Sequence, residues 1–224
     1  MTGGTLSGLA VDADDPTIYR ALFTPEAGFD GEAEIALKAA RYEDQVGNLG
    51  LAGSAEVTVD TVAPALTFDP VAGDDLINAR EAEGGVVISG TTEAEAGQVV
   101  TLDIAGANAA QLTGLEAAVD ANGAWSVTLS EAQLEGLGAD DALSDLTLTA
   151  RVSDAAGNAS ETSAVVGYDT RAAALTVAPL FGDDVLNAAE AGAALSVSGS
   201  SLEVGAGAPV TVAFEVDANT TLTA

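Results

Sequence analysis

The chain has 224 residues, and 35 aspartates and glutamates against six lysines and arginines give it a net charge of −29. Because it contains no cysteine and no histidine, disulfides, thiolate chemistry, the usual zinc sites and histidine-based catalytic triads are excluded. A field of this sign repels nucleic acid and anionic membrane surfaces, so neither is expected as a partner. A hydrophobic content of 48% favours a folded chain over acidic disorder.

Residues 1–60 contain short β-branched runs, and we expect Met1 to lie inside a longer protein. No basic segment with an apolar stretch behind it follows Met1, so a signal peptide is not expected. No apolar run reaches the ~18 residues of a membrane-spanning helix, so membrane insertion is not expected in this part of the protein. The predicted strands are Ile18–Phe23, Ala33–Ala40 and Ala55–Asp60.

Residues 61–169 have the pattern of an all-β domain, because short β-branched runs are separated by turn residues. Trp125 stands in an alternating run and is interpreted as a core residue. A hairpin-type turn is predicted at Asp120–Gly123. Helical spacing occurs only in Ser130–Leu137, with Ser130 as the N-cap. The predicted strands are Val86–Ser89, Val99–Ile104, Trp125–Leu129, Leu146–Val152 and Ala164–Tyr168.

The sequence also repeats itself at a long, constant interval. Ala40–Asn48 (ARYEDQVGN) returns as Ala150–Asn158 (ARVSDAAGN), 110 residues further along. Phe68–Ala79 returns as Val177–Ala188 with an offset of 109 residues. Such a period is too long for a solenoid repeat and indicates a tandem array of self-contained domains.

The repeat frame divides the chain into three parts. Residues 1–60 match the second half of a domain, 61–169 form a complete domain, and 170–224 match the first half of the next. Six or seven short strands with one tryptophan favour a two-sheet sandwich. The expected fold class is all-β: tandem immunoglobulin-like β-sandwich domains, one complete and two partial. In the last part, the predicted strands are Leu175–Val177, Leu195–Ser198 and Val210–Val216.

Five motifs follow one another along the chain: DTVAP at Asp60–Pro64, VAGDDLINA with a later Glu at Val71–Glu81, SGTT at Ser89–Thr92, GAWSV at Gly123–Val127 and SDAAGN at Ser153–Asn158. In this combination the chain resembles the bacterial Ig-like repeats of giant adhesins, the RTX-type and biofilm-associated proteins exported by type I secretion. The middle domain and most of the third part carry the resemblance, and residues 1–60 resemble a sister subtype. The third part lacks the proline that stiffens the first linker. The resemblance implies a secreted, cell-surface protein whose extender domains have junctions rigidified by calcium.

Carboxylates gather where neighbouring domains would meet. In an immunoglobulin-type order, the turn at Gly73–Glu81 and the end of the last strand at Asp169 lie at one pole. The loop that holds Asp154 lies at the other pole, beside Glu95 and facing Asp60. Ca²⁺ takes six to eight oxygen ligands, which two loops and a linker aspartate can supply. The candidate calcium ligands are Asp60, Asp74, Asp75, Asn78, Glu81, Asp154, Asp169 and, by repetition, Asp183, Asp184 and Glu190.

These carboxylates also have simpler interpretations. Asp154 before Gly-Asn can shape a turn alone, and the Gly73-Asp-Asp segment can be a bare turn. Asp120 is interpreted as a turn residue rather than a ligand, and the loop around Asp145 as solvated. The acidity of the whole chain can reflect adaptation to high salt. These alternatives remain open at the level of sequence.

Three classes of function can be compared on this basis. The leading hypothesis is a structural spacer of a surface adhesin, whose partners are the neighbouring Ig-like repeats of the same chain. The alternative is a module that binds a glycan or a protein through its loops, although aromatic residues make up only 4% of the chain. An enzyme is not expected, because the carboxylates repeat at domain junctions instead of pairing in a cleft.

Overall fold

The computed structural model describes residues 3–138, 143–180, 187–189, 196–205, 207–217 and 220–223. It divides into two compact units, Met1–Asp169 and Thr170–Ala224. The three-part frame that the repeat suggests stays a prediction.

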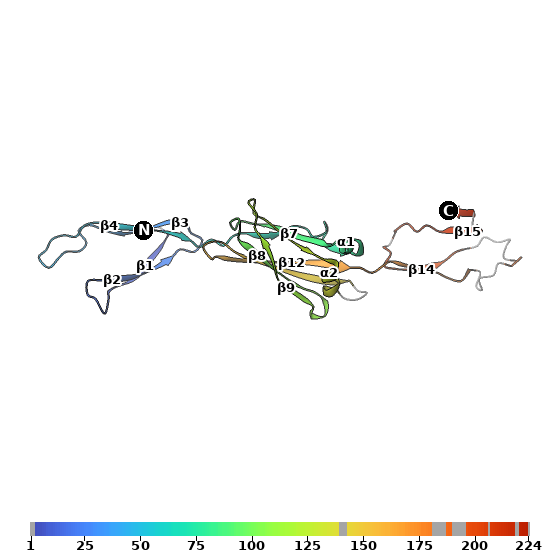
Figure 1. The fold of residues 1–224 in the computed structure, drawn as a ribbon, viewed down its shortest axis with the longest axis horizontal. Helices are drawn as coiled ribbons and strands as arrows, with labels where there is room; N and C mark the ends of the chain where they lie inside the picture. The colour runs from blue at the N-terminus through green and yellow to red at the C-terminus, as the bar shows by residue number, and fades with distance from the viewer. Residues whose placement is uncertain are drawn as a thin grey trace. The chain divides into compact units, whose positions relative to one another are not determined.

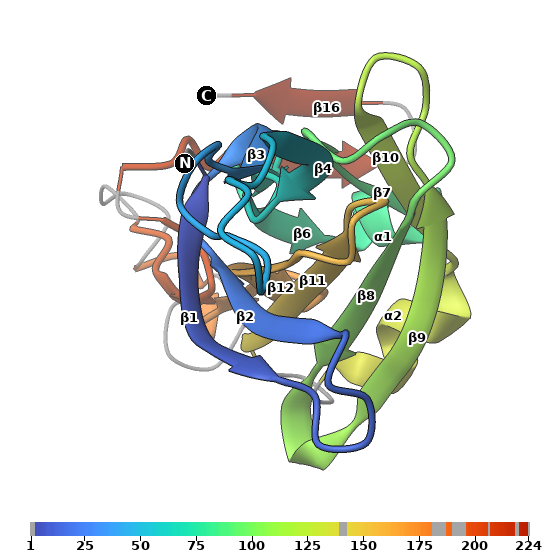
Figure 2. The same cartoon turned by 90° about the vertical axis from the view of Figure 1, so that its left-hand side faces the viewer.

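Most of the first unit is a sandwich of two β-sheets, drawn mainly in green and yellow in Figure 1. One sheet has the order β10 (Ala124–Leu129), β7 (Val86–Thr92) and β5 (Leu66–Phe68). The other has the order β6 (Leu76–Asn78), β12 (Ala159–Asp169), β11 (Ser144–Ser153), β8 (Val99–Ala105) and β9 (Gln111–Ala118). Figure 2 shows β12, β11, β8 and β9 in this order across the larger sheet. The all-β, immunoglobulin-like prediction is therefore confirmed.

The core lies between these two sheets because inward and outward residues alternate along the strands. In β7, for example, Val86 and Ile88 are buried while Val87 is exposed. One continuous core joins residues of both sheets. Trp125 belongs to it, 2% exposed and in edge-to-face contact with Phe68 at a centroid distance of 5.4 Å. The prediction that Trp125 is a core residue is thus confirmed.

Two short α-helices of the first unit each begin at a capping box. The predicted helix is α2 (Glu131–Leu137), with Ser130 as its N-cap and Gln133 completing a capping box. A second helix, α1 (Ala79–Glu83), begins after Asn78 and was not predicted. A single 3₁₀ turn, η1 (Ala107–Ala109), precedes β9.

One predicted connection is wrong in its topology. Asp120 accepts hydrogen bonds from the amides of Asn122 and Ala124, so the expected turn is present. However, β9 before it pairs with β8, and β10 after it pairs with β7. The turn therefore carries the chain from one sheet to the other, because β9 and β10 belong to different sheets and do not pair with each other as a hairpin.

Residues 3–60 form two hairpins in the first unit. β1 (Gly4–Val11) pairs with β2 (Tyr19–Pro25), and β3 (Asp30–Leu37) pairs with β4 (Gly53–Asp60). Three of these strands were predicted within a few residues, and β1 was not. Large apolar side chains stay exposed here, as Leu9 at 75% shows, in contrast to the closed core of residues 66–169.

In the second unit, β13 (Ala174–Val177) pairs with β14 (Gly199–Leu202), and β15 (Ala213–Asp217) pairs with β16 (Thr220–Thr223). The hydroxyls of Thr176 and Ser200 lie 2.6 Å apart across the first pair, as those of Thr67 and Thr91 lie 2.9 Å apart in the first unit. The repeat therefore conserves the register of this strand pair. The strand predicted at Leu195–Ser198 is wrong for residues 196–198, which precede β14, and Leu195 lies outside the described residues.

Candidate functional site

The linker around Thr61 is hydrogen-bonded to the loop between β2 and β3. The Thr61 hydroxyl donates to the carbonyl of Glu26 at 2.8 Å and accepts from the amide of Phe29 at 2.9 Å. The Thr61 amide donates to the Phe29 carbonyl, also at 2.9 Å. This single threonine therefore ties the start of the linker to the part of the chain that precedes it.

The same linker is held from its other side by β12 and the turn before it. The Asn158 side-chain amide donates to the carbonyl of Asp60 at 3.3 Å, and the Ser160 hydroxyl donates to the carbonyl of Pro64. Pro64 has a restricted φ angle, which further limits the linker. Asn158, Ser160 and Thr61 were not singled out from the sequence. Asn158 ends the D-x-x-G-N motif (residues 154–158) and Thr61 follows Asp60, whereas Ser160 belongs to no motif found in the sequence.

The D-x-x-G-N motif forms the same turn at both of its positions. Asp154 accepts from the backbone and side-chain amides of Asn158 at 2.8 and 2.9 Å, and Asp44 accepts from those of Asn48 at 2.9 and 2.7 Å. Burial pushes the pKa of Asp154 upward, but the bonds from Asn158 together with the amides of Gly157 and Ala156 outweigh it and hold the pKa below its usual range. Both aspartates therefore shape their turns, while ligation of a cation by Asp154 stays a prediction.

The loops that were expected to share this pole do approach each other. Ala155 donates its amide to a carboxylate oxygen of Glu95 at 2.9 Å, which joins the loop after β7 to the turn after β11. The carbonyl of Asp60 is in contact with Asn158 of that turn, and its carboxylate accepts from the amide of Val62 at 2.9 Å. These bonds join three segments to one another: the loop after β7, the turn after β11 and the linker.

At the opposite end of the sandwich, Asp74 and Asp75 organise the turn that leads into β6. Asp74 accepts from the amide of Leu76 at 3.2 Å, and Asp75 accepts from that of Val71 at 2.9 Å. Asp75 has a φ of 61°, a left-handed conformation that aspartate tolerates better than most residues. Its carbonyl accepts from Gly167 at 2.8 Å, which fixes the turn against β12.

Asn78, Glu81 and Asp169 lie on neighbouring elements at this same end. Asn78 and Asp169 are paired across β6 and β12, the parallel strand pair. The Asn78 side chain accepts from the amides of Arg80 and Glu81 at 3.0 and 3.1 Å, and Glu81 accepts from the Asn78 amide at 3.0 Å. These bonds form a capping box, which the N-x-x-E pattern of Asn78 and Glu81 could have indicated from the sequence. Its side chains serve the start of α1.

The candidate metal ligands of the second unit lie outside the described residues; they are Asp183, Asp184 and Glu190. Among the residues that the structure does describe, no group of three or more acidic side chains is arranged to hold a metal ion. The donors at both ends of the sandwich are oxygens, which is the ligand type that Ca²⁺ requires. The chemistry of the donors fits calcium, and the predicted ligand set stays untested.

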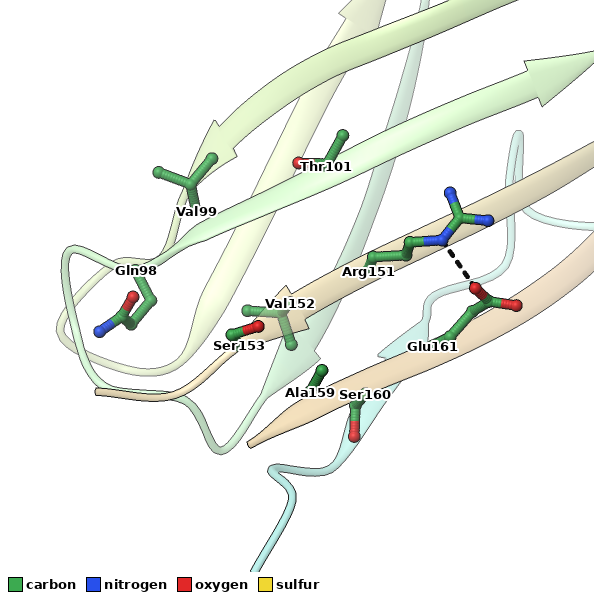
Figure 3. A pocket seen from close by; sticks show the side chains of 9 residues that line it. All are labelled: Gln98, Val99, Thr101, Arg151, Val152, Ser153, Ala159, Ser160 and Glu161. Carbon is green, nitrogen blue, oxygen red and sulfur yellow. Dashed lines mark hydrogen bonds and ion pairs between the residues drawn. The ribbon is translucent and has the colours of Figure 1, made fainter. Parts of the chain in front are cut away.

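An open hollow of about 440 Å³ lies on the outer face of the larger sheet (Figure 3). Polar side chains of β8, β11 and β12 line it, among them Thr101, Arg151 and Glu161. None of its lining residues is aromatic. It offers no stacking platform of the kind that sugar binding uses, so this hollow does not favour the alternative of a glycan-binding module.

Comparison with known proteins identifies the class of the first part of the chain. Residues 1–61 match the family described as bacterial Ig-like domain. Among curated proteins, none matches the chain. In the part of the chain that the structure describes, no helix is long and apolar enough to cross a membrane.

Three solved structures show sequence similarity to the chain. One is described as a "Ca2+-stabilized adhesin" that "helps an Antarctic bacterium reach out and bind ice" (29% identity over 99% of this chain and 54% of that one, TM-score 0.42). Another is a tetra-tandem repeat in the extending region of a large adhesion protein (24%, 96% and 50%, TM-score 0.38). The third is a bacterial immunoglobulin-like domain of the M. primoryensis ice-binding adhesin (32%, 47% and 95%, TM-score 0.33). The chain spans about half the length of the first two.

The strand order of residues 66–169 defines an immunoglobulin-like sandwich, and the internal repeat links it to the parts before and after it. The first of these parts belongs to the bacterial Ig-like domain family, which residues 1–61 match directly.

Proposed function

We propose that the chain is an extender segment of a large bacterial surface adhesin, in which Ig-like domains act as spacers and Ca²⁺ fixes their junctions. The observation that carries the proposal is the linker at residues 60–64. Thr61 bonds to the segment before it, and Asn158 and Ser160 bond to its carbonyls from the sandwich after it. A linker held from both sides suits a spacer, whose task is to limit bending between neighbouring domains.

The arrangement of acidic residues supports a cation at such junctions. At one end of the sandwich the Asn158 side-chain amide bonds both the Asp60 backbone carbonyl and the Asp154 carboxylate, and the other end carries the remaining candidates of the first unit. Carboxylates about 5 Å apart repel each other by roughly 1 to 3 kcal/mol per pair without a compensating charge. We therefore propose that Ca²⁺ is bound by two sets of ligands: Asp60 with Asp154, and Asp74, Asp75, Asn78, Glu81 and Asp169, the latter set repeated as Asp183, Asp184 and Glu190.

The calcium proposal extends to this chain what is said of the similar Ca2+-stabilized adhesin. It is tested by thermal unfolding with millimolar Ca²⁺ and with a chelator, at matched ionic strength. Linkage predicts about 2.7 kcal/mol of added stability at a hundredfold excess over Kd. Mg²⁺ at the same concentration is the control for general charge screening, because it binds dedicated protein cages poorly. Identical curves in all three conditions would favour salt adaptation as the reason for the acidity.

A double variant locates the ions. Asp74→Asn with Asp75→Asn keeps side chains that can accept the same backbone hydrogen bonds but removes two negative charges. We expect titration calorimetry to show the loss of at least one Ca²⁺ site. Glu116→Gln with Glu135→Gln removes the same charge from exposed positions that are not candidate ligands, and it should leave every site intact. Equal Ca²⁺ binding by both double variants would remove the turn at residues 74–75 from the ligand set.

The spacer role makes a separate prediction about the gene. A protein of this kind should contain many further copies of the repeat and a terminal export signal. A full-length gene that encodes a single Ig-like domain beside an unrelated catalytic domain would refute the spacer role, whatever the calcium measurements show.

A further inference from the structure

The larger sheet ends at β9, whose free edge is interrupted by a bulge. Leu115 pairs with Leu102, but the next pair towards the start of β9 is Leu112 with Ile104. Residues 113 and 114 of β9 therefore lie opposite the single residue Asp103 of β8. Gly114 has a φ of +70°, which a glycine adopts without strain, and no atom would contact a Cβ added there.

A row of polar contacts leads from this bulge across the outer face of the sheet. The Gly114 amide donates to Asp103 Oδ1 at 2.8 Å, and Asp103 Oδ2 lies 2.6 Å from Arg151 Nη1. Arg151 Nε donates to Glu161 Oε2 at 2.6 Å, the contact drawn in Figure 3. The row joins β9, β8, β11 and β12 in order. The Gly114 amide and the Arg151 guanidinium hold the pKa of Asp103 below its usual range despite some desolvation.

Stability alone does not account for this row. Arg151 and Glu161 are 48% and 60% exposed, and ion pairs between exposed side chains contribute little to folding. What the row does determine is the direction of one backbone group. The Gly114 amide is turned towards β8 and is satisfied there, so this donor is withheld from the free edge of β9.

β9 is an eight-residue strand at the edge of its sheet. The partner that could pair with this edge is β9 of a second copy of the chain. Two β9 strands are self-complementary in an antiparallel pair about a twofold axis, and a free edge presents unpaired amides and carbonyls to such a strand. On both sides of the bulge β9 pairs regularly with β8, so the bulge is the one interruption of this strand pair.

We infer that the row Glu161–Arg151–Asp103–Gly114 holds β9 in its bulged form and thereby closes this sheet edge to β9 of a second copy. The inference concerns lateral contact between copies and does not depend on calcium at the junctions. It gives Arg151, part of the repeated motif, a role that the junction does not use.

The test straightens the edge and measures pairing of copies. Because the chain has no cysteine, Glu116→Cys on β9 is a single reporter whose disulfide forms between copies that pair there. It is combined with deletion of Gly114 and, separately, with Asp103→Ser. Oxidation in about 0.5 M NaCl, which screens repulsion beyond ~4 Å, should raise the disulfide-linked dimer about tenfold over the reporter alone. Glu131→Cys on α2 is the matched control and should show no rise.

Folding of each variant is checked by the fluorescence of Trp125. If both folded variants give as little dimer as the reporter alone, the bulge does not guard the edge and the inference is overturned. A second measurement needs no variant: hydrogen exchange of the Gly114 amide in the unaltered chain. Protection of this amide beyond that of its exposed neighbours is expected, and exchange at the rate of an open edge amide would refute the polar row.

Discussion

Gly90 in β7 provides the sharpest test of how the sandwich is packed. It lies opposite Phe68 of β5, and a Cβ added to it would be 1.9 Å from the carbonyl oxygen of Thr67 and 2.8 Å from Trp125 Cζ2. The carbonyl belongs to backbone in the β5–β7 ladder, so it cannot swing away as a flexible side chain would. Alanine at position 90 must therefore push β5 off the sheet and loosen the contact between Phe68 and Trp125.

The cost can be worked out from these distances. Relief of a 1.9 Å contact to an ordinary separation needs a backbone shift of more than about 1 Å, and overpacking of a well-packed core costs about 1–3 kcal/mol, occasionally more. Because β5 carries Phe68 into the core, we expect Gly90→Ala to lose about 3 kcal/mol. For a domain of this size the loss corresponds to a fall in Tm of roughly 10–15 °C.

The assay is urea unfolding followed by tryptophan fluorescence. Trp125 is the only tryptophan in the chain, so the signal reports the sandwich of residues 66–169. Gly136→Ala in α2 is the matched control, since no atom beyond its chain neighbours and the backbone of its own helix lies within 4 Å of the added Cβ. It should stabilise the helix by about 0.5–1 kcal/mol. A Gly90→Ala protein within about 0.5 kcal/mol of the unaltered chain would show that the β5–β7 packing is wrong.

Three further predictions follow from other contacts. Hydrogen bonds from the amides of Ala124 and Asn122 lower the pKa of Asp120. The ionised Asp120 side chain therefore stabilises the folded protein at pH values above its unfolded pKa of about 3.9. This stabilisation is lost as the pH falls through the lower folded pKa. Acid titration of Trp fluorescence should show a shallower loss of stability in Asp120→Asn than in the unaltered chain. Asn78→Ala removes the cap of α1 and should cost about 1 kcal/mol in the same urea assay, whereas no change would argue against the capping box. Limited proteolysis should leave a resistant core near residues 61–169, and uniform protection of the whole chain would contradict the repeat frame.

Local patterns in the sequence predicted much of this fold correctly. The alternation along Val86–Ser89, the single Trp125 in an alternating run, and Ser130 before a short helical segment each depend on neighbours only a few residues away. Such features follow from the period of two in strands and from capping chemistry. The repeat also carried information about the second unit, because equivalent hydroxyl pairs recur across its strands.

β9 was missed for a physical reason that the structure makes plain. Leu112 and Leu115 both face the core although they are three residues apart, because the bulge between them absorbs one residue. The alternation of apolar and polar residues that indicates a strand is therefore interrupted in the sequence. The bulge itself depends on Asp103, a residue of another strand, and local sequence contains no sign of this contact.

For the candidate site, too, some features follow from the sequence and others only from the tertiary structure. The sequence by itself determined the acidity, the D-x-x-G-N and Gly-Asp-Asp turns, and their return at a fixed interval, because turns are encoded by short runs of residues. Only the tertiary structure decided that Asn158 reaches the carbonyl of Asp60 across 98 positions and that β6 lies parallel to β12 beside Asp169. These contacts arise when the chain crosses between two sheets and brings distant segments to the same end, which no local pattern specifies.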